Sequence, residues 1–169
     1  MTMQYDVRSV KVQGPGLMYN GRVRLKQATV LGNGTAGYID FFDSTTAPVA
    51  ATYGRSGTTV TVASTAHGLS TGNTVGIAYV AASNVAPVSG NYVITVVDAD
   101  TFTITDLNSG TIAGGTVCKY VANARWVLGI NTGTNLQPFQ ILVPSEGILC
   151  LNGIYANSNN INSTQIVYG

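Results

Sequence analysis

Charged residues are scarce in this chain of 169 residues, where they make up 9% of the sequence and include three Lys and one Glu. An ordinary soluble domain carries roughly 25%. Ser, Thr and Asn, 46 residues in all, must therefore cover much of the surface. A net charge of +1 provides no general basic field for nucleic acid, so we expect no nucleic-acid partner. So few charges also give little protection against self-association, which favours an assembled state.

Long apolar runs and cysteine motifs are missing as well. No stretch of about eighteen apolar residues occurs, and the first residues do not form a basic segment followed by an apolar one. We therefore expect neither a membrane partner nor signal-directed secretion. The two cysteines, Cys118 and Cys150, lack the spacing of a redox or metal motif, and each lies in a strand-like run. Both are predicted to be reduced core residues.

Helical patterns are nearly absent, whereas strand patterns recur along the chain. Turn signals rich in Gly, Asn, Asp and Ser separate them, among them Asn108-Ser109-Gly110 and Gly114-Gly115. The sequence predicts an all-β fold, an antiparallel sandwich or barrel. The predicted strands are 7–12, 17–19, 21–31, 37–43, 58–63, 74–80, 91–97, 101–105, 116–121, 125–129, 139–143, 147–151, 154–156 and 165–168.

The style of the sequence changes in the middle of the chain. Residues 54–120 are predicted to form a separate meander of short strands, and the strand pattern of the flanking segments resumes near Trp126. We expect a projecting β module, residues 54–120, inserted into a β-sandwich body made of residues 1–53 and 121–169. A surface loop tolerates such an insertion because closing a long loop costs little extra entropy.

Positive charge gathers near the start of the chain. Within Gly21-Arg22-Val23-Arg24-Leu25-Lys26 the cations alternate with apolar residues, which places them on one face of a strand. That face is either an ordinary solvated one or a contact with an acidic partner or with another subunit. The candidate contact residues are Arg8, Lys11, Arg22, Arg24 and Lys26.

Residues that could carry catalysis or bind metal are few. His67 is the single histidine, which excludes a two-histidine metal site and favours a hydrogen-bonded turn residue. Asp98, Asp100 and Asp106 could offer oxygens to Ca²⁺, but the alternating ligand series and the bidentate Glu of a calcium loop are missing.

Paired carboxylates of the glycosidase kind are also not indicated. Asp40 and Asp43 flank Phe41-Phe42, yet residues three apart on a strand point to opposite faces, which favours the end of a hairpin. No Ser or Cys lies in a nucleophile elbow. We therefore expect no catalytic, cofactor or metal site and no enzymatic activity, with a depolymerase as the least favoured alternative.

Aromatic residues are the strongest candidates for binding. Nine Tyr and one Trp in a chain rich in Asn, Gln and Thr suit a β-rich protein interface, and they also suit stacking on sugars. We favour the interface. The candidate residues are Tyr5, Tyr19, Trp126 and Tyr155.

Two segments of the expected insert resemble a known module. Residues 66–75 read AHGLSTGNTV and residues 90–104 read GNYVITVVDADTFTI. They are similar to the module "HGL-x-TGD-x-V … G-x-Y-x-V-T-x-V-D-x-DTF-T" that recurs in virion proteins of tailed bacteriophages. Asn73 stands where the module usually has Asp, at a turn position where either side chain can bond to the backbone.

The flanks resemble small phage structural proteins. Residues 21–26 read GRVRLK, residues 143–150 read VPSEGILC, residues 153–155 read GIY and the last three read VYG. The resemblance implies a virion component on the outer surface of the particle, made in the host cytoplasm.

The resemblance also suggests a role. The favoured one is a capsid decoration, or cement, protein that clamps neighbouring major capsid subunits, and such proteins commonly occupy threefold positions, which implies a homotrimer. The alternative is a tail- or fibre-associated adhesin that binds host surface polysaccharide.

Overall fold

The structure of the protein, a computed structural model, describes residues 8–80 and 85–169. It contains no helix in those ranges and is 69% strand, arranged in antiparallel sheets, which confirms the all-β fold expected from the sequence. Nothing in the described ranges is therefore a helix long and apolar enough to cross a membrane. The candidate residue Tyr5 lies outside the described residues.

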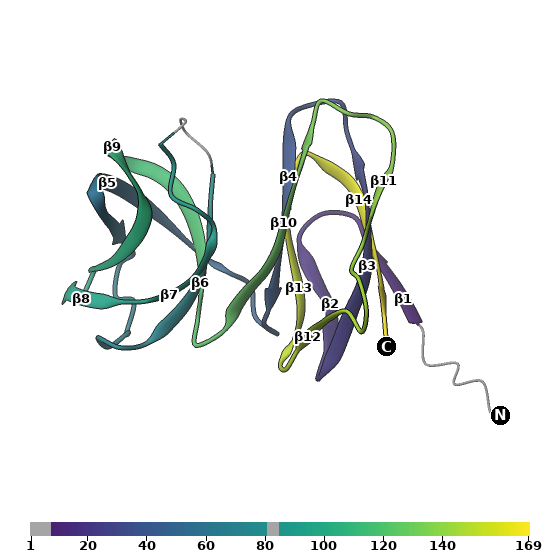
Figure 1. Cartoon of the computed structure of the whole chain (residues 1–169), viewed down its shortest axis with the longest axis horizontal. Coiled ribbons are helices and arrows are strands. Elements are labelled where there is room, and N and C mark those ends of the chain that lie inside the picture. The colour runs from purple at the N-terminus through teal and green to yellow at the C-terminus, as the bar shows by residue number, and fades with distance from the viewer. Residues whose placement is uncertain (1–7, 81–84) are drawn as a thin grey trace. The chain divides into compact units, whose positions relative to one another are not determined.

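Fourteen strands are described, and Figure 1 labels them. They are β1 (Arg8–Val12), β2 (Gly16–Asn20), β3 (Val23–Gly32), β4 (Gly37–Asp43), β5 (Val49–Ala63), β6 (Thr74–Tyr79), β7 (Gly90–Val93), β8 (Thr95–Asp98), β9 (Thr101–Ala122), β10 (Arg125–Gly133), β11 (Phe139–Leu142), β12 (Ile148–Cys150), β13 (Gly153–Asn159) and β14 (Ile161–Tyr168).

The chain forms two compact units. Unit 1 comprises Met1–Ala47 and Val127–Gly169, and unit 2 comprises Pro48–Trp126. The expected division at residues 54 and 120 falls inside two strands, because β5 and β9 already pair at Val49 and Tyr120. Unit 2 therefore begins and ends a few residues outside the expected insert.

Unit 1 is a sandwich of two sheets. One has the strand order β1-β14-β3-β11 with β12 beside β3, and the other has the order β10-β4-β13-β2. Alternate residues of both sheets point inward and form one core. Its buried members include Val23, Leu25, Phe41, Ile154 and Ile166.

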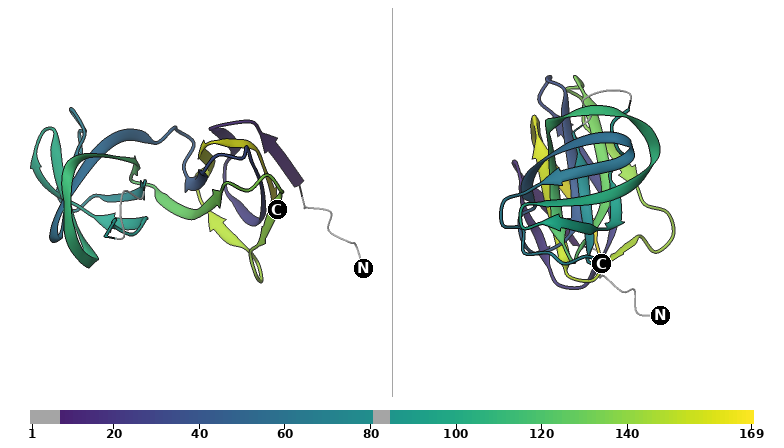
Figure 2. Two further views of the ribbon diagram at one scale, coloured as in Figure 1. Left: turned by 90° about the horizontal axis from the view of Figure 1, so that it is seen from above. Right: turned by 90° about the vertical axis from the view of Figure 1, so that its left-hand side faces the viewer.

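Unit 2 consists of one strongly bent sheet with the order β5-β9-β6-β7 and with β8 beside β9. The strands β5 and β9 curl together along their length, as the right-hand view of Figure 2 shows. The sheet bends around a core of its own. That core includes Tyr53, Val62, Ile77, Phe102 and Tyr120.

Two predicted turns are wrong, because Asn108-Ser109-Gly110 and Gly114-Gly115 lie within the strand β9. The register between β5 and β9 shifts twice, between Tyr53 and Arg55 and between Gly57 and Thr59. These irregularities are β-bulges, which bend and twist a strand pair without ending it. The glycines thus mark bends in one long ribbon, whereas the sequence pattern indicated separate short strands.

Another predicted strand, residues 91–97, is divided into β7 and β8 at Ile94. The Ile94 side chain is buried in the core of unit 2. Its backbone leaves the ladder to bond with the turn before β6, where Gly72 N–H donates to Ile94 O and Ile94 N–H donates to Asn73 O. The alternation of residue types alone does not reveal this change of partner.

Candidate functional site

The basic strand β3 has the predicted alternation at its start. Val23 and Leu25 are buried in the core of unit 1, whereas Arg22 is exposed. Arg24 forms an ion pair with Glu146, with 3.0 Å between Nη2 and Oε2. Lys26 falls at a register shift, since Leu25 lies opposite Tyr168 and Gln27 opposite Val167. Arg22 and Arg24 therefore share one face, and part of their charge is neutralised within the chain.

The other two candidate cations lie on β1, in the same sheet as β3. The strand β14 separates β1 from β3. Arg8 lies opposite Tyr168, and Lys11 lies opposite Gln165, which in turn faces Thr29. Both cations are exposed. The five cations thus share a sheet but are spread over two strands and do not form one compact patch.

The three described candidate aromatic residues differ in their surroundings. The ring of Tyr19 packs 4.7 Å from that of Tyr168, between centroids, and both contact the core of unit 1. Tyr155 lies on β13 between two core residues, Ile154 and Ala156, so its side chain points away from that core. Trp126 belongs to unit 2.

The backbone of Trp126 is fastened by Asn91 of β7. The Trp126 N–H donates to Asn91 Oδ1 at 2.7 Å, and Asn91 Nδ2 donates to Trp126 O at 3.0 Å. The strand β6 packs against the same peptide, because a Cβ added to Gly76 would lie 2.2 Å from the Trp126 nitrogen. Sequence reasoning missed Asn91, since no local pattern marks a side chain that pairs with a distant backbone.

The HGL motif holds a turn. Leu69 N–H donates to His67 Nδ1 at 3.0 Å, so the ring proton is on Nε2, which lies 3.0 Å from the carbonyl oxygen of Asp98. The ring also meets Phe102 edge-on, with 5.4 Å between centroids. His67 is therefore the hydrogen-bonded turn residue that the sequence predicted.

Asp98 and Asp100 stabilise neighbouring turns by accepting hydrogen bonds from backbone N–H groups. Asp98 Oδ1 accepts a hydrogen bond from Asp100 N–H at 2.8 Å, and Asp100 Oδ1 accepts one from Ala66 N–H at 2.6 Å. Asp106, the third residue considered for Ca²⁺, lies in a separate buried network. Within residues 8–80 and 85–169 no three His, Cys, Asp or Glu side chains are grouped as a metal site requires.

Asp106 forms a buried ion pair with Arg55. Arg55 Nη2 lies 2.7 Å from Asp106 Oδ1, and the two side chains are 0% and 1% exposed. The guanidinium also donates to Gly57 O at 2.9 Å and to Val85 O at 2.6 Å. Every side of the Arg55 head group thus has a partner, which a buried charge requires.

The carboxylate of Asp106 is equally well satisfied. It accepts hydrogen bonds from the N–H groups of Val88 and Asn108, at 3.0 and 2.8 Å, and from Tyr92 Oη at 3.2 Å. Burial raises the pKa of Asp106, but these bonds and the bond from Arg55 outweigh it and hold the pKa below its usual value. Burial and the adjacent Asp106 raise the pKa of Tyr92. The network ties the loop before β7 to β5 and β9.

Asp40 and Asp43 do not face each other as a catalytic pair. The Asp43 carboxylate accepts three backbone hydrogen bonds, from Leu151, Asn152 and Gly153, at 3.0, 2.7 and 3.3 Å. It therefore holds the connection between β12 and β13. Asp40 lies opposite Asn157 in the β4–β13 register.

Both cysteines are buried, as expected. Burial raises the pKa of the Cys118 thiol to about 12, so that the thiolate is not available at neutral pH.

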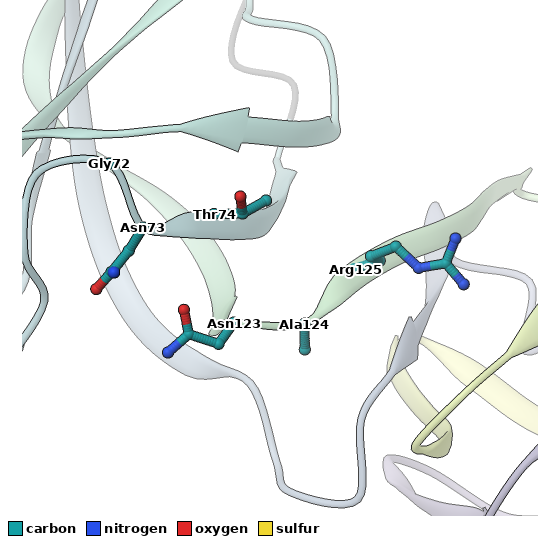
Figure 3. A pocket seen from close by; sticks show the side chains of 6 residues that line it. All are labelled: Gly72, Asn73, Thr74, Asn123, Ala124 and Arg125. Atoms are coloured by element: carbon teal, nitrogen blue, oxygen red, sulfur yellow. The ribbon is translucent and has the colours of Figure 1, made fainter.

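An open pocket of about 380 Å³ lies in unit 2 between the turn before β6 and the turn after β9. Figure 3 shows the carboxamides of Asn73 and Asn123 on the same side of the pocket, while the guanidinium of Arg125 extends the other way. The hydroxyl of Thr74 points away from the two carboxamides in this view. The lining residues include no carboxylate, and their side chains offer amide, hydroxyl and guanidinium groups for hydrogen bonding.

A second hollow, of about 340 Å³, lies along the bend of β5 and β9. We name it the glycine groove, after Gly54, Gly114 and Gly115, which line it together with Thr52, Thr61 and Ala63. Arg55 also borders it, but the side chain of Arg55 is turned inward to Asp106 and is 0% exposed. The groove therefore presents no charge.

No family model matches the chain, and no curated protein matches it.

Proposed function

We propose that the chain is a non-enzymatic structural protein of a tailed-phage virion, a homotrimeric capsid decoration protein on the outer surface of the particle. In this role it binds the outer shell and stabilises contacts between major capsid subunits. The sequence resemblances of both the insert and the flanks support the proposal, and the surface of the molecule supports it independently.

The observation that carries the proposal is the character of that surface. Among the described residues, ten large aliphatic side chains are at least 42% exposed, on a chain with 9% charged residues. Val93, Val97, Leu107, Leu136 and Leu142 are each more than 60% exposed. Single exposed aliphatic residues are normal, but with so little charge around them they favour association. A protein that buries this apolar surface against capsid subunits and against copies of itself accounts for this composition.

The polar residues of the resembled module support a structural role in another way. His67, Asp98 and Asp100 all bond to the backbone of turns, and Asp106 is enclosed with Arg55. Their chemistry is thus used in folding the module. Attachment then rests on burial of apolar and Tyr-bearing surface, with Arg22 and Lys11 as exposed cations for an acidic capsid surface.

The test is the number of copies on intact particles, counted by labelling the chain with a small fluorophore. A capsid decoration protein is present in hundreds of copies, and a tail or vertex protein in a few to a few dozen. A count in the lower range would overturn the capsid role.

The second candidate function is that of a tail- or fibre-associated adhesin for host polysaccharide, and the pocket of Figure 3 favours it. Its amide and hydroxyl groups, from Asn73, Asn123 and Thr74, are of the kind that hydrogen-bond sugar hydroxyls. Asn73 Oδ1 also accepts a hydrogen bond from Ser70 N–H at 2.9 Å, and Asn123 has a left-handed backbone with a φ of 52°. The test therefore uses Asn73→Asp with Asn123→Asp, which keeps the acceptor and suits that backbone but removes both amide donors. Binding of purified host polysaccharide that is lost in this double variant would favour this function over the first.

A further inference from the structure

Asparagine followed directly by glycine occurs twice in the chain, at Asn33-Gly34 and at Asn152-Gly153. In such a pair the backbone nitrogen of the glycine can attack the side-chain carbonyl carbon of the asparagine. The step is intramolecular and closes a five-membered ring, and glycine has no side chain to hinder it. The two pairs have the same local chemistry, so only the fold can make one of them more reactive than the other.

The pair Asn33-Gly34 lies in the connection between β3 and β4. Asn33 and Thr35 are both exposed, and Thr35 N–H donates a hydrogen bond to Asn33 Oδ1 at 2.9 Å. The ring of atoms that this bond closes contains the Gly34 nitrogen, so the Asn33 side chain is folded over the peptide that must attack it. The same N–H stabilises the negative charge that develops on Oδ1 during the attack.

The surroundings of Gly34 leave its peptide room to turn. Gly34 has a left-handed backbone with a φ of 87°. A Cβ added there would lie 3.1 Å from Leu136 Cδ2, and Leu136 is itself 62% exposed. The glycine therefore packs against the end of an exposed side chain, and its nitrogen can approach Asn33 with little loss of packing.

The pair Asn152-Gly153 is held in place by Asp43. Asn152 N–H and Gly153 N–H both donate to Asp43 Oδ1, at 2.7 and 3.3 Å, and Asn152 Nδ2 donates to Asp43 O at 3.4 Å. Gly153 is buried, and a Cβ added to it would lie 2.5 Å from Tyr19 O. An attack by the Gly153 nitrogen must first break its bond to the carboxylate and move a tightly packed peptide. The fold therefore protects this pair.

We propose that Asn33 is a site of self-modification, at which Gly34 displaces the side-chain amide of Asn33 as ammonia. The Gly34 nitrogen forms a bond to Asn33 Cγ and the bond from Cγ to Nδ2 breaks. The proton of the Gly34 nitrogen is transferred through solvent to the departing amide. Water then adds to one of the two carbonyl carbons of the cyclic imide and opens the ring. The product is aspartate or isoaspartate, and no oxidant or reductant is needed.

The modification changes both the charge and the main chain at one turn of unit 1. Either product adds one carboxylate, which lowers the net charge of this chain from +1 to zero. Isoaspartate also adds a methylene group to the main chain between β3 and β4. The inference does not depend on the proposed function, because it uses only contacts within unit 1.

Peptide mass mapping of the folded, full-length protein tests the selectivity between the two pairs. The protein is incubated at mildly alkaline pH in water enriched in heavy oxygen, because solvent water supplies the new carboxylate oxygen. Asn33 should be modified at least about tenfold faster than Asn152, since attack at Asn152 must first break hydrogen bonds to Asp43. In concentrated urea the two pairs should be modified at similar rates, because Asp43 then no longer holds Asn152.

Two matched variants separate the sites. Asn33→Gln lengthens the side chain by one methylene group and disfavours closure of the ring, so the folded variant should release much less ammonia than the wild type. Asn152→Gln makes the same change in the protected pair and should leave the release of ammonia almost unchanged. Circular dichroism verifies that both variants are folded.

Several results would overturn the proposal. They are equal rates at Asn33 and Asn152 in the folded protein, modification of both pairs in urea but of neither in the folded protein, equal release of ammonia by the two variants, or modified Asn33 peptides that contain no heavy oxygen. None of these results bears on the number of copies on particles, so failure of this inference and failure of the capsid role remain distinguishable.

Discussion

Arg55 and Asp106, 51 residues apart in the sequence, meet in unit 2 as an ion pair of 2.7 Å with both side chains almost fully buried. The pair joins the bulge of β5 to β9 and fixes the backbone on both sides of it. Removing either residue would leave the other as an unpaired buried charge, which costs far more free energy than the ion pair contributes. The two residues therefore depend on each other.

The first prediction compares this buried pair with the surface pair of Arg24 and Glu146. Asp106→Asn should lower the free energy of unfolding of unit 2 by about 3–5 kcal/mol, since it leaves the Arg55 charge uncompensated. Glu146→Gln should cost less than about 1 kcal/mol, because Glu146 is 78% exposed. Urea unfolding followed by circular dichroism measures both. Similar losses in the two variants would contradict the assigned burial.

The second prediction concerns acid. The pKa of Asp106 is lower in the folded protein than in the unfolded chain. Its carboxylate therefore contributes stability above the unfolded pKa of about 3.9, and this contribution is lost as the pH falls through the folded pKa. Unit 2 should lose stability below about pH 4, whereas Asp106→Asn should show a smaller loss over the same range. Thermal unfolding at pH 7, 4 and 3 provides the comparison, and parallel curves would refute it.

The third prediction concerns the fastening of Trp126. Asn91→Ala removes both hydrogen bonds to the Trp126 backbone, so the Trp126 amide should exchange with solvent faster and unit 2 should lose about 1 kcal/mol. The matched control is Asn108→Ala, because Asn108 is an exposed residue of unit 2 and its hydrogen bond to Asp106 comes from the backbone N–H, which alanine keeps. Hydrogen exchange read by NMR distinguishes the two, and unchanged protection in Asn91→Ala would count against the clamp.

The fourth prediction tests the basic strand. Arg22→Glu combined with Arg24→Glu reverses the charge of one face while Val23 and Leu25 stay buried beneath it. If this face meets an acidic capsid surface, binding to stripped particles should weaken and lose much of its salt dependence, since exposed charges are screened over about 10 Å at 0.1 M salt.

The opposite charge change serves as the control for that prediction. Glu146→Lys removes the anion paired with Arg24 and adds a cation, so it should strengthen binding at low salt. Unaltered occupancy in both variants, with the fold intact, would identify the face as an ordinary solvated one and direct the search to the apolar strands.

Local patterns in the sequence were enough to predict the all-β class and the role of several residues. The alternation in residues 21–26 predicted the burial of Val23 and Leu25, and the single histidine next to a glycine predicted a turn residue. These features depend on neighbours along the chain. Side-chain alternation and turn chemistry are local properties, which is why they can be read directly.

Features that depend on distant partners could not be predicted. The pairing of Arg55 with Asp106 and of Asn91 with Trp126 arises only when the long ribbon of β5 and β9 has bent. Gly110, Gly114 and Gly115 were interpreted as turn residues, but glycine is favoured equally in turns and in β-bulges. The cross-strand register decides between them, and a single sequence does not contain it.

The pairing of Val49 with Tyr120 has a mechanical consequence. The chain enters unit 2 along β5 and leaves it along the far end of the antiparallel β9, so tension transmitted through the chain pulls two adjacent strands apart from one end. The hydrogen bonds of the ribbon are then loaded one after another, as in a zipper, and not all together as in shear. The bonds between Asn91 and Trp126 lie close to the outgoing end and take the load early. Tension applied between Val49 and Tyr120 should therefore peel unit 2 open at a low force and lengthen it.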